Sequence, residues 1–142
     1  MDFRAMAEAV QPEVVAFRRD LHEHPEASFQ EFRTTEQIAK EMDKLGIPYR
    51  RFEPTGLIAE IKGGKPGKTI ALRADIDALS ITEKTGLPFA SKNDGFMHAC
   101  GHDTHAAMLV GAAKVLMQVK DQLCGTVKLL FQPAEETTGG AR

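Results

Sequence analysis

The stretch GTVKLLFQPAEE at residues 125–136 decides the fold of this chain. Residues 126–132 are apolar enough for a central β-strand, and Pro133 ends that strand. Glu135 and Glu136 therefore emerge at its carboxyl end. In an open α/β sheet, this is the edge at which ligands bind. The sequence thus places a pair of carboxylates where a functional site is expected.

The preceding segments supply a helix and two further strands. Asp103 and Thr104 are good N-cap residues for a helix that runs through apolar positions to about residue 119. Residues 57–62 and 69–74 are short, apolar and rich in β-branched side chains, and the glycine-rich connection between them predicts a loose hairpin. Strands and a helix in this order predict an α/β sheet.

Two helices are predicted nearer the amino terminus. Apolar residues recur every three or four positions over residues 3–22, which is typical of a helix that packs one face into the core. Pro25 ends that helix. Ser28 and Glu31 form a capping box that opens a second helix, and Gly46 closes it as a C-terminal cap.

The composition indicates one ordinary globular domain. The chain has 142 residues, of which 42% are hydrophobic and 27% charged, and its 18 basic and 20 acidic side chains give a formal charge of -2. Without a strong basic cluster or a long apolar run, we expect neither a nucleic-acid nor a membrane partner. The amino terminus lacks a signal-peptide pattern and the two cysteines have unlike surroundings, so we expect a cytoplasmic protein.

The segment HACGHDTH at residues 98–105 points to a metal. Cys100 and His102 are two residues apart, so on extended backbone their side chains point the same way and can converge on one ion. A thiolate, an imidazole and a carboxylate from Glu135 or Glu136 are donors that a borderline-soft divalent ion takes, and the second carboxylate can serve as a base for water. These groups predict a metal-hydrolase site and favour zinc, cobalt or nickel over magnesium.

A nucleophilic role for the cysteine is an open alternative. Cys100 could attack a substrate with His98 or His105 as its base, which predicts a thiol hydrolase. That interpretation leaves Glu135 and Glu136 without a role. It predicts activity that survives a chelator and is lost on alkylation of the thiol.

Other polar residues have two interpretations each. Asp75 and Asp77 alternate at the end of the second strand, so both face one side, either toward the site or paired with Arg73 or a backbone amide. Cys124 has no histidine nearby and is expected to be a small, partly buried residue at the start of the last strand. The ligand-like surroundings of Cys100 disfavour a disulfide between the two cysteines.

Four blocks of the chain together match a known family. They are FRRDLHEHPE at residues 17–26, ALRADIDAL at 71–79, MHACGHDTH at 97–105 and LFQPAEE at 130–136. With these blocks the sequence resembles the metal-dependent amidohydrolases that include hippurate hydrolase, N-acetyl-diaminopimelate deacetylase and the indole-acetyl-amino-acid hydrolases. These enzymes are a branch of the aminoacylase and carboxypeptidase-like metallopeptidases.

The resemblance implies roles for individual residues at the site. Cys100, His102 and Glu136 would bind metal, and Glu135 would be the general base. Asp75 stands where related branches place a histidine ligand, so it is not assigned to metal.

It also implies supporting residues. Asp77 would orient the site from behind the ligands and His105 would support it. Asp103 would cap the helix that follows the metal ligands. His22 and His24 match the amino-terminal block, and their expected role is structural.

The fold implied by the resemblance is the amino-terminal part of a zinc-peptidase-like catalytic domain, over residues 1–142. It has a central mixed sheet flanked by helices, and the lid or dimerisation domain is absent from this chain. The implied reaction is metal-dependent hydrolysis of the amide bond of N-acetyl, N-benzoyl or similar N-acyl amino acids, which releases a carboxylic acid and a free amino acid.

The resemblance further implies a cofactor and partners. One or two divalent ions per subunit would be bound, zinc or manganese, with cobalt or nickel as alternatives. The partner would be a small-molecule N-acyl amino acid, and the full-length protein would be a homodimer. Because the family completes its centre with two later histidines, the alternative is a truncated, catalytically inactive metal-binding fragment.

Overall fold

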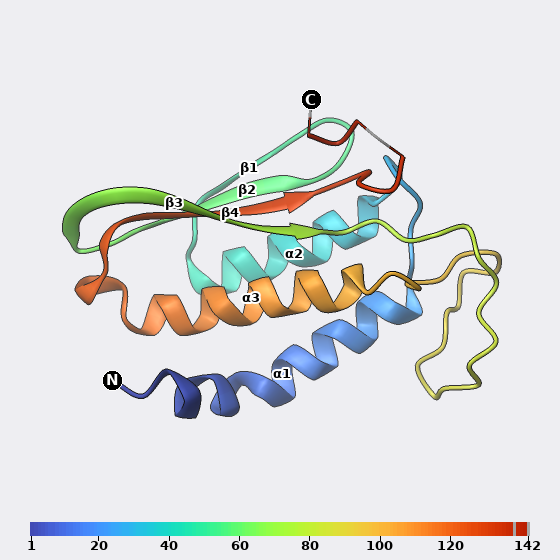
Figure 1. Cartoon of the computed structure of the whole chain (residues 1–142), viewed down its shortest axis with the longest axis horizontal. Helices are drawn as coiled ribbons and strands as arrows, with labels where there is room; N and C mark the ends of the chain where they lie inside the picture. Colours follow the sequence, from blue (N-terminus) through green and yellow to red (C-terminus); the bar gives the residue numbers. More distant parts are fainter. Residues whose placement is uncertain (138, 142) are drawn as a thin grey trace.

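A four-stranded sheet carries three α-helices on one of its faces (Figure 1). The computed structural model describes residues 1–137 and 139–141. Its elements, in chain order, are α1 (Phe3–Glu23), α2 (Phe32–Leu45), β1 (Tyr49–Arg51), β2 (Leu57–Lys62), β3 (Lys65–Asp75), α3 (His102–Gln118), the short 3₁₀ helix η1 (Lys120–Gln122) and β4 (Cys124–Gln132). The predicted α/β class with a mixed sheet is confirmed.

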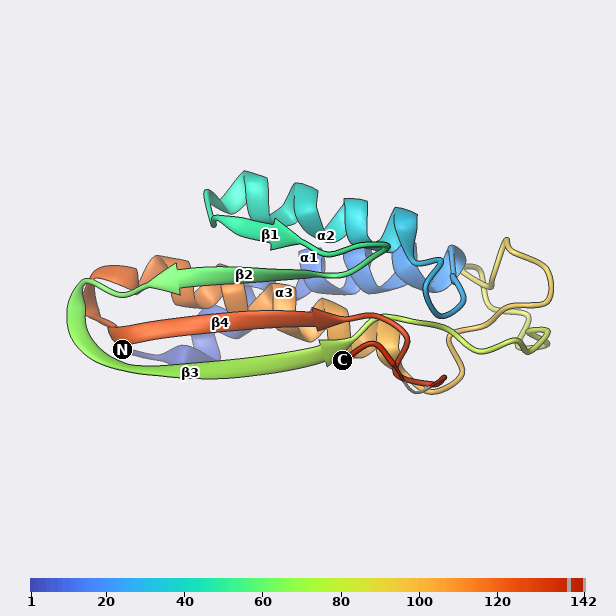
Figure 2. The same cartoon turned by 90° about the horizontal axis from the view of Figure 1, so that it is seen from above.

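The order of the strands is β1-β2-β4-β3, with β4 in the interior of the sheet (Figure 2). β4 runs antiparallel to β2 and parallel to β3. The predicted hairpin between residues 57–62 and 69–74 is therefore wrong, because β4 lies between these strands. The glycines of the connection between β2 and β3 instead let two backbone segments approach closely. A Cβ atom on Gly63 would lie 2.4 Å from the carbonyl oxygen of Leu123.

β3, α3 and β4 form a strand–helix–strand unit that positions the site. Parallel neighbours need a long crossover connection, and α3 supplies its helix. The pairing brings the carboxyl ends of β3 and β4 side by side, with Asp75 in register with Gln132. The predicted central strand and its end before Pro133 are confirmed. Residues 76–101 connect β3 to α3 without a regular helix or strand.

α1 has the predicted extent but packs mainly on α3, away from the sheet (Figure 1). The helices approach closely, since a Cβ atom on Gly111 would lie 2.8 Å from Cγ2 of Val14. Only Leu21 and His22 of α1 are buried, and Phe3 is 51% exposed. Core packing along the whole apolar stripe was expected and is wrong, because a helix in this outer layer packs mainly on one neighbouring helix.

A different carboxylate caps α2. The capping box at Ser28 and Glu31 is wrong, since neither side chain caps the helix. The Glu26 carboxylate instead accepts hydrogen bonds from the backbone N–H groups of Arg33 and Thr34, at 3.0 and 2.6 Å. It satisfies donors of the first turn that have no partner within the helix and faces the positive end of the helix dipole.

α3 begins at His102, earlier than predicted, with Gly101 as its N-cap at a φ of +99°. Asp103 and Thr104 are therefore wrong as N-cap residues. Asp103 lies in the first turn, where its fully buried side chain faces α1. The end of α2 agrees with the prediction, because Gly46 has a φ of +67° and closes the helix in the left-handed conformation.

The hydrophobic core lies between the sheet and the helices α2 and α3. Its largest fully buried side chains include those of Ile38, Met42, Leu57, Ile61, Val110, Leu129 and Phe131. Cys124 is exposed rather than partly buried, because it begins β4 at the far end of the sheet, and both cysteines are free thiols. No helix within residues 1–137 and 139–141 has the length and apolarity needed to cross a membrane.

Candidate metal centre

Three elements bring polar side chains to the carboxyl edge of the sheet. Asp75 ends β3, and Glu135 and Glu136 lie in the turn that follows β4. His102 is the first residue of α3, and Cys100 precedes it by two positions. This clustering follows from the parallel pairing of β3 and β4, since parallel strands end at the same edge.

Cys100, His102 and Glu136 converge as the sequence predicts. Each offers one donor atom, and these three atoms all lie within 4.8 Å of one another. His102 is buried, Glu136 is partly buried and Cys100 is exposed. A sulfur, a nitrogen and an oxygen in this arrangement can surround one borderline-soft divalent ion.

Asp77 fixes the ring of His102. The Nδ1 atom of His102 lies 2.9 Å from the backbone oxygen of Asp77 and 3.2 Å from its carboxylate Oδ1. With Nδ1 held in this way, Nε2 faces the site, 3.8 Å from a carboxylate oxygen of Glu135 and 3.8 Å from one of Glu136. An oxygen behind the ring that selects the tautomer is the usual arrangement for a metal-binding histidine.

The environment of Asp77 shifts the pKa values of both partners. Burial would raise the pKa of Asp77, but hydrogen bonds from His102, from the Glu136 N–H and from the Ser28 hydroxyl lower it to about 2. The same carboxylate raises the pKa of His102 to about 9, against the opposing effect of burial. In the metal-free chain the imidazole therefore holds a proton at neutral pH, which an ion must displace.

Glu136 and Cys100 offer a cation an oxygen and a sulfur that lie close together. The Oε1 atom of Glu136 is buried and has no hydrogen-bond partner among the described residues. The carboxylate of Glu136, followed by burial, raises the pKa of the Cys100 thiol. An unpartnered buried oxygen beside a thiol is an arrangement that a divalent ion would satisfy.

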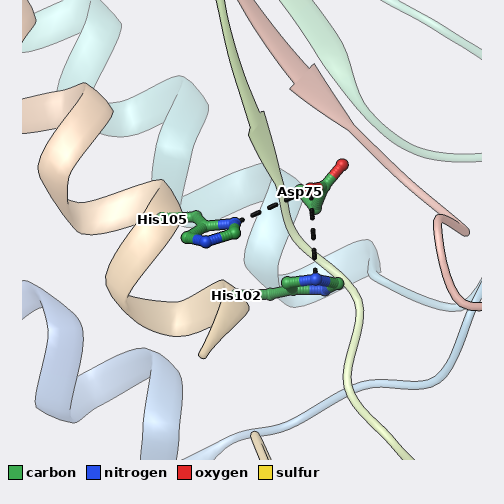
Figure 3. Close-up of side chains that lie close together, drawn as sticks. All are labelled: Asp75, His102 and His105. Atoms are coloured by element: carbon green, nitrogen blue, oxygen red, sulfur yellow. Dashed lines mark ion pairs between the residues drawn. The ribbon is translucent and has the colours of Figure 1, made fainter. Parts of the chain in front are cut away.

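Asp75 faces both histidines of α3 (Figure 3). Its Oδ2 lies 3.6 Å from Nδ1 of His105 and 3.9 Å from Nε2 of His102. Its Oδ1 accepts hydrogen bonds from Arg73 at 2.8 and 3.1 Å, which is the pairing that the sequence left open. Asp75, His102 and His105 are thus a second set of donors within 4.8 Å of one another, and the two sets share His102.

Glu135 lies at the mouth of the site. Its Oε2 is 3.8 Å from Nε2 of His102, and its side chain is 38% exposed. A carboxylate that is close to the donors and open to solvent can exchange protons with water. The position agrees with that of a base.

Glu31 supports the turn that carries both glutamates, which the sequence did not reveal. The buried Glu31 accepts hydrogen bonds from the Thr55 hydroxyl at 2.6 Å and from the N–H of Ala134 at 2.8 Å. Burial raises the pKa of this carboxyl group despite these bonds. No local signal could have identified the contact, because Glu31 and Ala134 are 103 residues apart.

His98 and Asp103 flank the candidate donors Cys100 and His102 in the sequence. His98 is buried, burial lowers its pKa to about 4, and neither of the two donor sets includes it. Asp103 was expected to cap α3, but its side chain does not do so. It lies 2.8 Å from Nδ1 of His22 and 2.7 Å from Nε of Arg18.

Comparison with known proteins shows the same fold and similar sequences. The chain is 54% identical over 134 residues to an N-acetylcysteine deacetylase of Bacillus subtilis, covering 91% of this chain and 34% of that protein. It is 44% identical over 142 residues to an N-acyl-L-amino acid amidohydrolase of Geobacillus stearothermophilus, covering 99% of this chain and 38% of that protein. The chain thus spans about a third of the length of the curated relatives it matches.

A solved structure from Bacillus subtilis, described as a dinuclear metal-binding peptidase of family M20, superposes with a TM-score of 0.91 at 53% identity. The match covers 95% of this chain and 38% of that one. Residues 71–142, which include every proposed donor, match peptidase family M20/M25/M40. Half of the chain therefore carries the family's sequence pattern, and this chain belongs to peptidase family M20/M25/M40.

Proposed function

We propose that this chain is the amino-terminal portion of the catalytic domain of a metal-dependent amidohydrolase. Its reaction would be hydrolysis of the amide bond of N-acyl amino acids. The observation that carries the proposal is the convergence of Cys100, His102 and Glu136, with a buried oxygen of Glu136 left without a hydrogen-bond partner. The similarity to an N-acyl-L-amino acid amidohydrolase supports this substrate class, and the similarity to an N-acetylcysteine deacetylase supports acetyl as the acyl group.

In this proposal each residue has a distinct task. Cys100, His102 and Glu136 would hold one or two divalent ions, and Asp77 would keep Nε2 of His102 turned toward them. A bound ion would polarise the acyl carbonyl and lower the pKa of water. Glu135 would take the proton of the attacking water and return it to the amine nitrogen that leaves.

The donor set limits the choice of ion. The sulfur of Cys100 and the nitrogen of His102 suit zinc, cobalt or nickel, and the carboxylates also suit manganese. We propose zinc or manganese as the resident ion. The description of the similar Bacillus subtilis structure as dinuclear supports two ions in the complete centre.

Metal content and hydrolysis, measured together, test the proposal. The purified chain is loaded with Zn²⁺ or Mn²⁺, freed of excess ion and subjected to elemental analysis, and then assayed with N-acetylcysteine and hippurate with and without a chelator. We expect at least one ion per chain, lost in a Glu136→Ala variant, and any hydrolysis to stop with the chelator. A chain that takes up no ion would contradict the proposal.

A second candidate is a metal-binding segment that does not catalyse the reaction alone. It is favoured by one observation: the chain spans about a third of its relatives' length, so residues outside it can contribute to the site in a longer protein. Bound metal without hydrolysis of either substrate would support this candidate. Bound metal with chelator-sensitive hydrolysis would exclude it.

A further inference from the structure

A second group of buried charged side chains lies behind the metal centre, and the proposed reaction does not use it. His22 stands between two carboxylates, with Nδ1 2.8 Å from Oδ2 of Asp103 and Nε2 2.9 Å from Oε1 of Glu83. None of the three side chains is more than 3% exposed. We refer to His22, Glu83 and Asp103 as the buried triad.

The buried triad joins three separate parts of the chain. His22 belongs to α1, Glu83 to the irregular residues 76–101, and Asp103 to the first turn of α3. Two of these parts also carry the proposed metal centre. Asp77 and Cys100 lie in residues 76–101, and His102 precedes Asp103 directly.

The hydrogen bonds of the buried triad define one arrangement. Each ring nitrogen of His22 has its own carboxylate partner, Asp103 for Nδ1 and Glu83 for Nε2, so the ring keeps both hydrogen bonds in only one orientation. The guanidinium of Arg18 adds a cation, with Nε 2.7 Å from Oδ2 of Asp103. Removing one partner from such a set leaves a buried charge without compensation, which disfavours any arrangement that separates the three side chains.

Residues 76–101 depend on such contacts for their position. They form no regular helix or strand, and one isolated bridge pairs Leu79 with Met97. Glu83 also accepts hydrogen bonds from the hydroxyl of Thr85 and the N–H of Ser91. It therefore holds Thr85 and Ser91 of this segment close to His22.

We propose that the buried triad positions the metal ligands: by fixing residues 76–101 and the first turn of α3 against α1, it sets the separation of Cys100 and His102. His22, Glu83 and Asp103 are positioning residues and touch neither ion nor substrate. This inference rests on the proposed function, because it requires that the chain binds a metal.

The chain contains a matched control for this inference. Lys92 lies in the same irregular segment and its Nζ is 2.6 Å from Oε2 of Glu23 in α1. This pair therefore ties the same two parts together, but the Lys92 side chain is 64% exposed. An exposed pair contributes little to stability and does not fix a single geometry.

Cobalt spectroscopy separates positioning from simple stabilisation. The unchanged chain and the His22→Gln, Glu83→Gln and Lys92→Ala variants are titrated with Co²⁺, at a temperature where circular dichroism shows each to be folded. The intensity and shape of the d–d bands report the coordination geometry, and the titration reports the affinity. We expect His22→Gln and Glu83→Gln to bind Co²⁺ about tenfold more weakly with altered bands. Lys92→Ala should match the unchanged chain.

Two results would overturn the inference. In the first, His22→Gln and Glu83→Gln melt at lower temperature but keep the affinity and bands of the unchanged chain, so the buried triad only stabilises the fold. In the second, the unchanged chain binds no Co²⁺, which refutes the proposed function as well. If His22→Gln does not fold, Glu83→Gln decides, because it keeps the size of the side chain and removes its charge.

Discussion

Asp77 holds the imidazole of His102 with two different oxygens, its backbone carbonyl at 2.9 Å and its carboxylate at 3.2 Å. The carboxylate also accepts hydrogen bonds from the hydroxyl of Ser28 and the N–H of Glu136. One side chain thus orients a proposed ligand from α3 and fixes the backbone of a second one after β4. Asp77 is therefore the residue on which the relative placement of the two ligands depends most directly.

Replacing Asp77 should weaken metal binding although it removes none of the proposed metal-binding atoms. In Asp77→Ala the ring of His102 keeps one of its two acceptors, and the N–H of Glu136 loses its partner. We expect Zn²⁺ affinity to fall by about 10- to 100-fold, measured by competition with a chromophoric chelator. Asp121→Asn, at an exposed position in η1, should bind as the unchanged chain does. Equal affinity in the Asp77 variant would show that the ligands are placed by other contacts.

The two neighbouring glutamates should separate binding from chemistry. Glu135→Gln keeps the size of the side chain and the three converging donors, so the variant should retain its metal and lose any chelator-sensitive hydrolysis. Glu136→Ala removes a donor and should lose the metal. Elemental analysis and hydrolysis of N-acetylcysteine measure the two effects. Loss of metal from both variants alike would contradict the division of roles.

Metal binding should release protons. The pKa of His102 is raised to about 9 and that of the Cys100 thiol is raised as well, so at pH 7 both groups hold a proton that a metal displaces. We expect about two protons per ion, and an apparent affinity that rises with pH toward 9. Calorimetric titration in buffers of different ionisation enthalpy measures the number. Cys100→Ser should release about one proton fewer, and release of none by the unchanged chain would refute the assignment.

Stability should fall in acid partly through Glu83. Burial would raise its pKa, but hydrogen bonds from His22, from the N–H of Ser91 and from Thr85 lower it to about 2, from 4.5 in the unfolded chain. A carboxyl group with a lowered pKa stabilises the fold above pH 4.5, and this contribution is lost as the pH falls toward 2. Urea unfolding should therefore show a difference in stability between the unchanged chain and Glu83→Gln that shrinks over this range. A constant difference would contradict the prediction.

Gly125 should be far less tolerant of a side chain than Gly86. Both glycines have a positive φ, +87° at Gly125 and +69° at Gly86. A Cβ atom on Gly125 would lie 2.0 Å from the carbonyl oxygen of Lys68, whereas a Cβ atom on Gly86 would have no neighbouring atom within 4 Å. Gly86→Ala should cost about 1–2 kcal/mol from the backbone conformation alone. Gly125→Ala should cost about 1–3 kcal/mol more from the clash. Thermal unfolding of the two variants measures the difference, and equal costs would contradict it.

Local patterns predicted the helices, the central strand and the convergence of Cys100, His102 and Glu136. The end of α2 at Gly46 needs a residue that tolerates positive φ, and the glycine is visible in the sequence. The proximity of Cys100, His102 and Glu136 could be predicted, because the carboxyl ends of the strands and the start of the following helix lie at one edge of an α/β sheet.

Contacts between distant residues could not be predicted in this way. The insertion of β4 between β2 and β3 depends on pairing across the whole chain. The Glu26 cap of α2 comes from outside the four-residue capping pattern, and the bond between His22 and Asp103 spans 81 positions. Each of these satisfies a buried polar group, and the sequence does not show which distant partner will do so.

The two edge strands of the sheet differ greatly in length. β1 ends it on one side with three residues, whereas β3 ends it on the other with eleven, and among the described residues no strand pairs with the outer edge of β3. Ile70 is 55% exposed along it. Backbone groups there are free to continue the hydrogen-bonded ladder. A strand added parallel to β3 would have its carboxyl end at the same edge of the sheet as Asp75. The side on which the sheet can be extended is therefore also the side from which further side chains can approach the proposed metal centre.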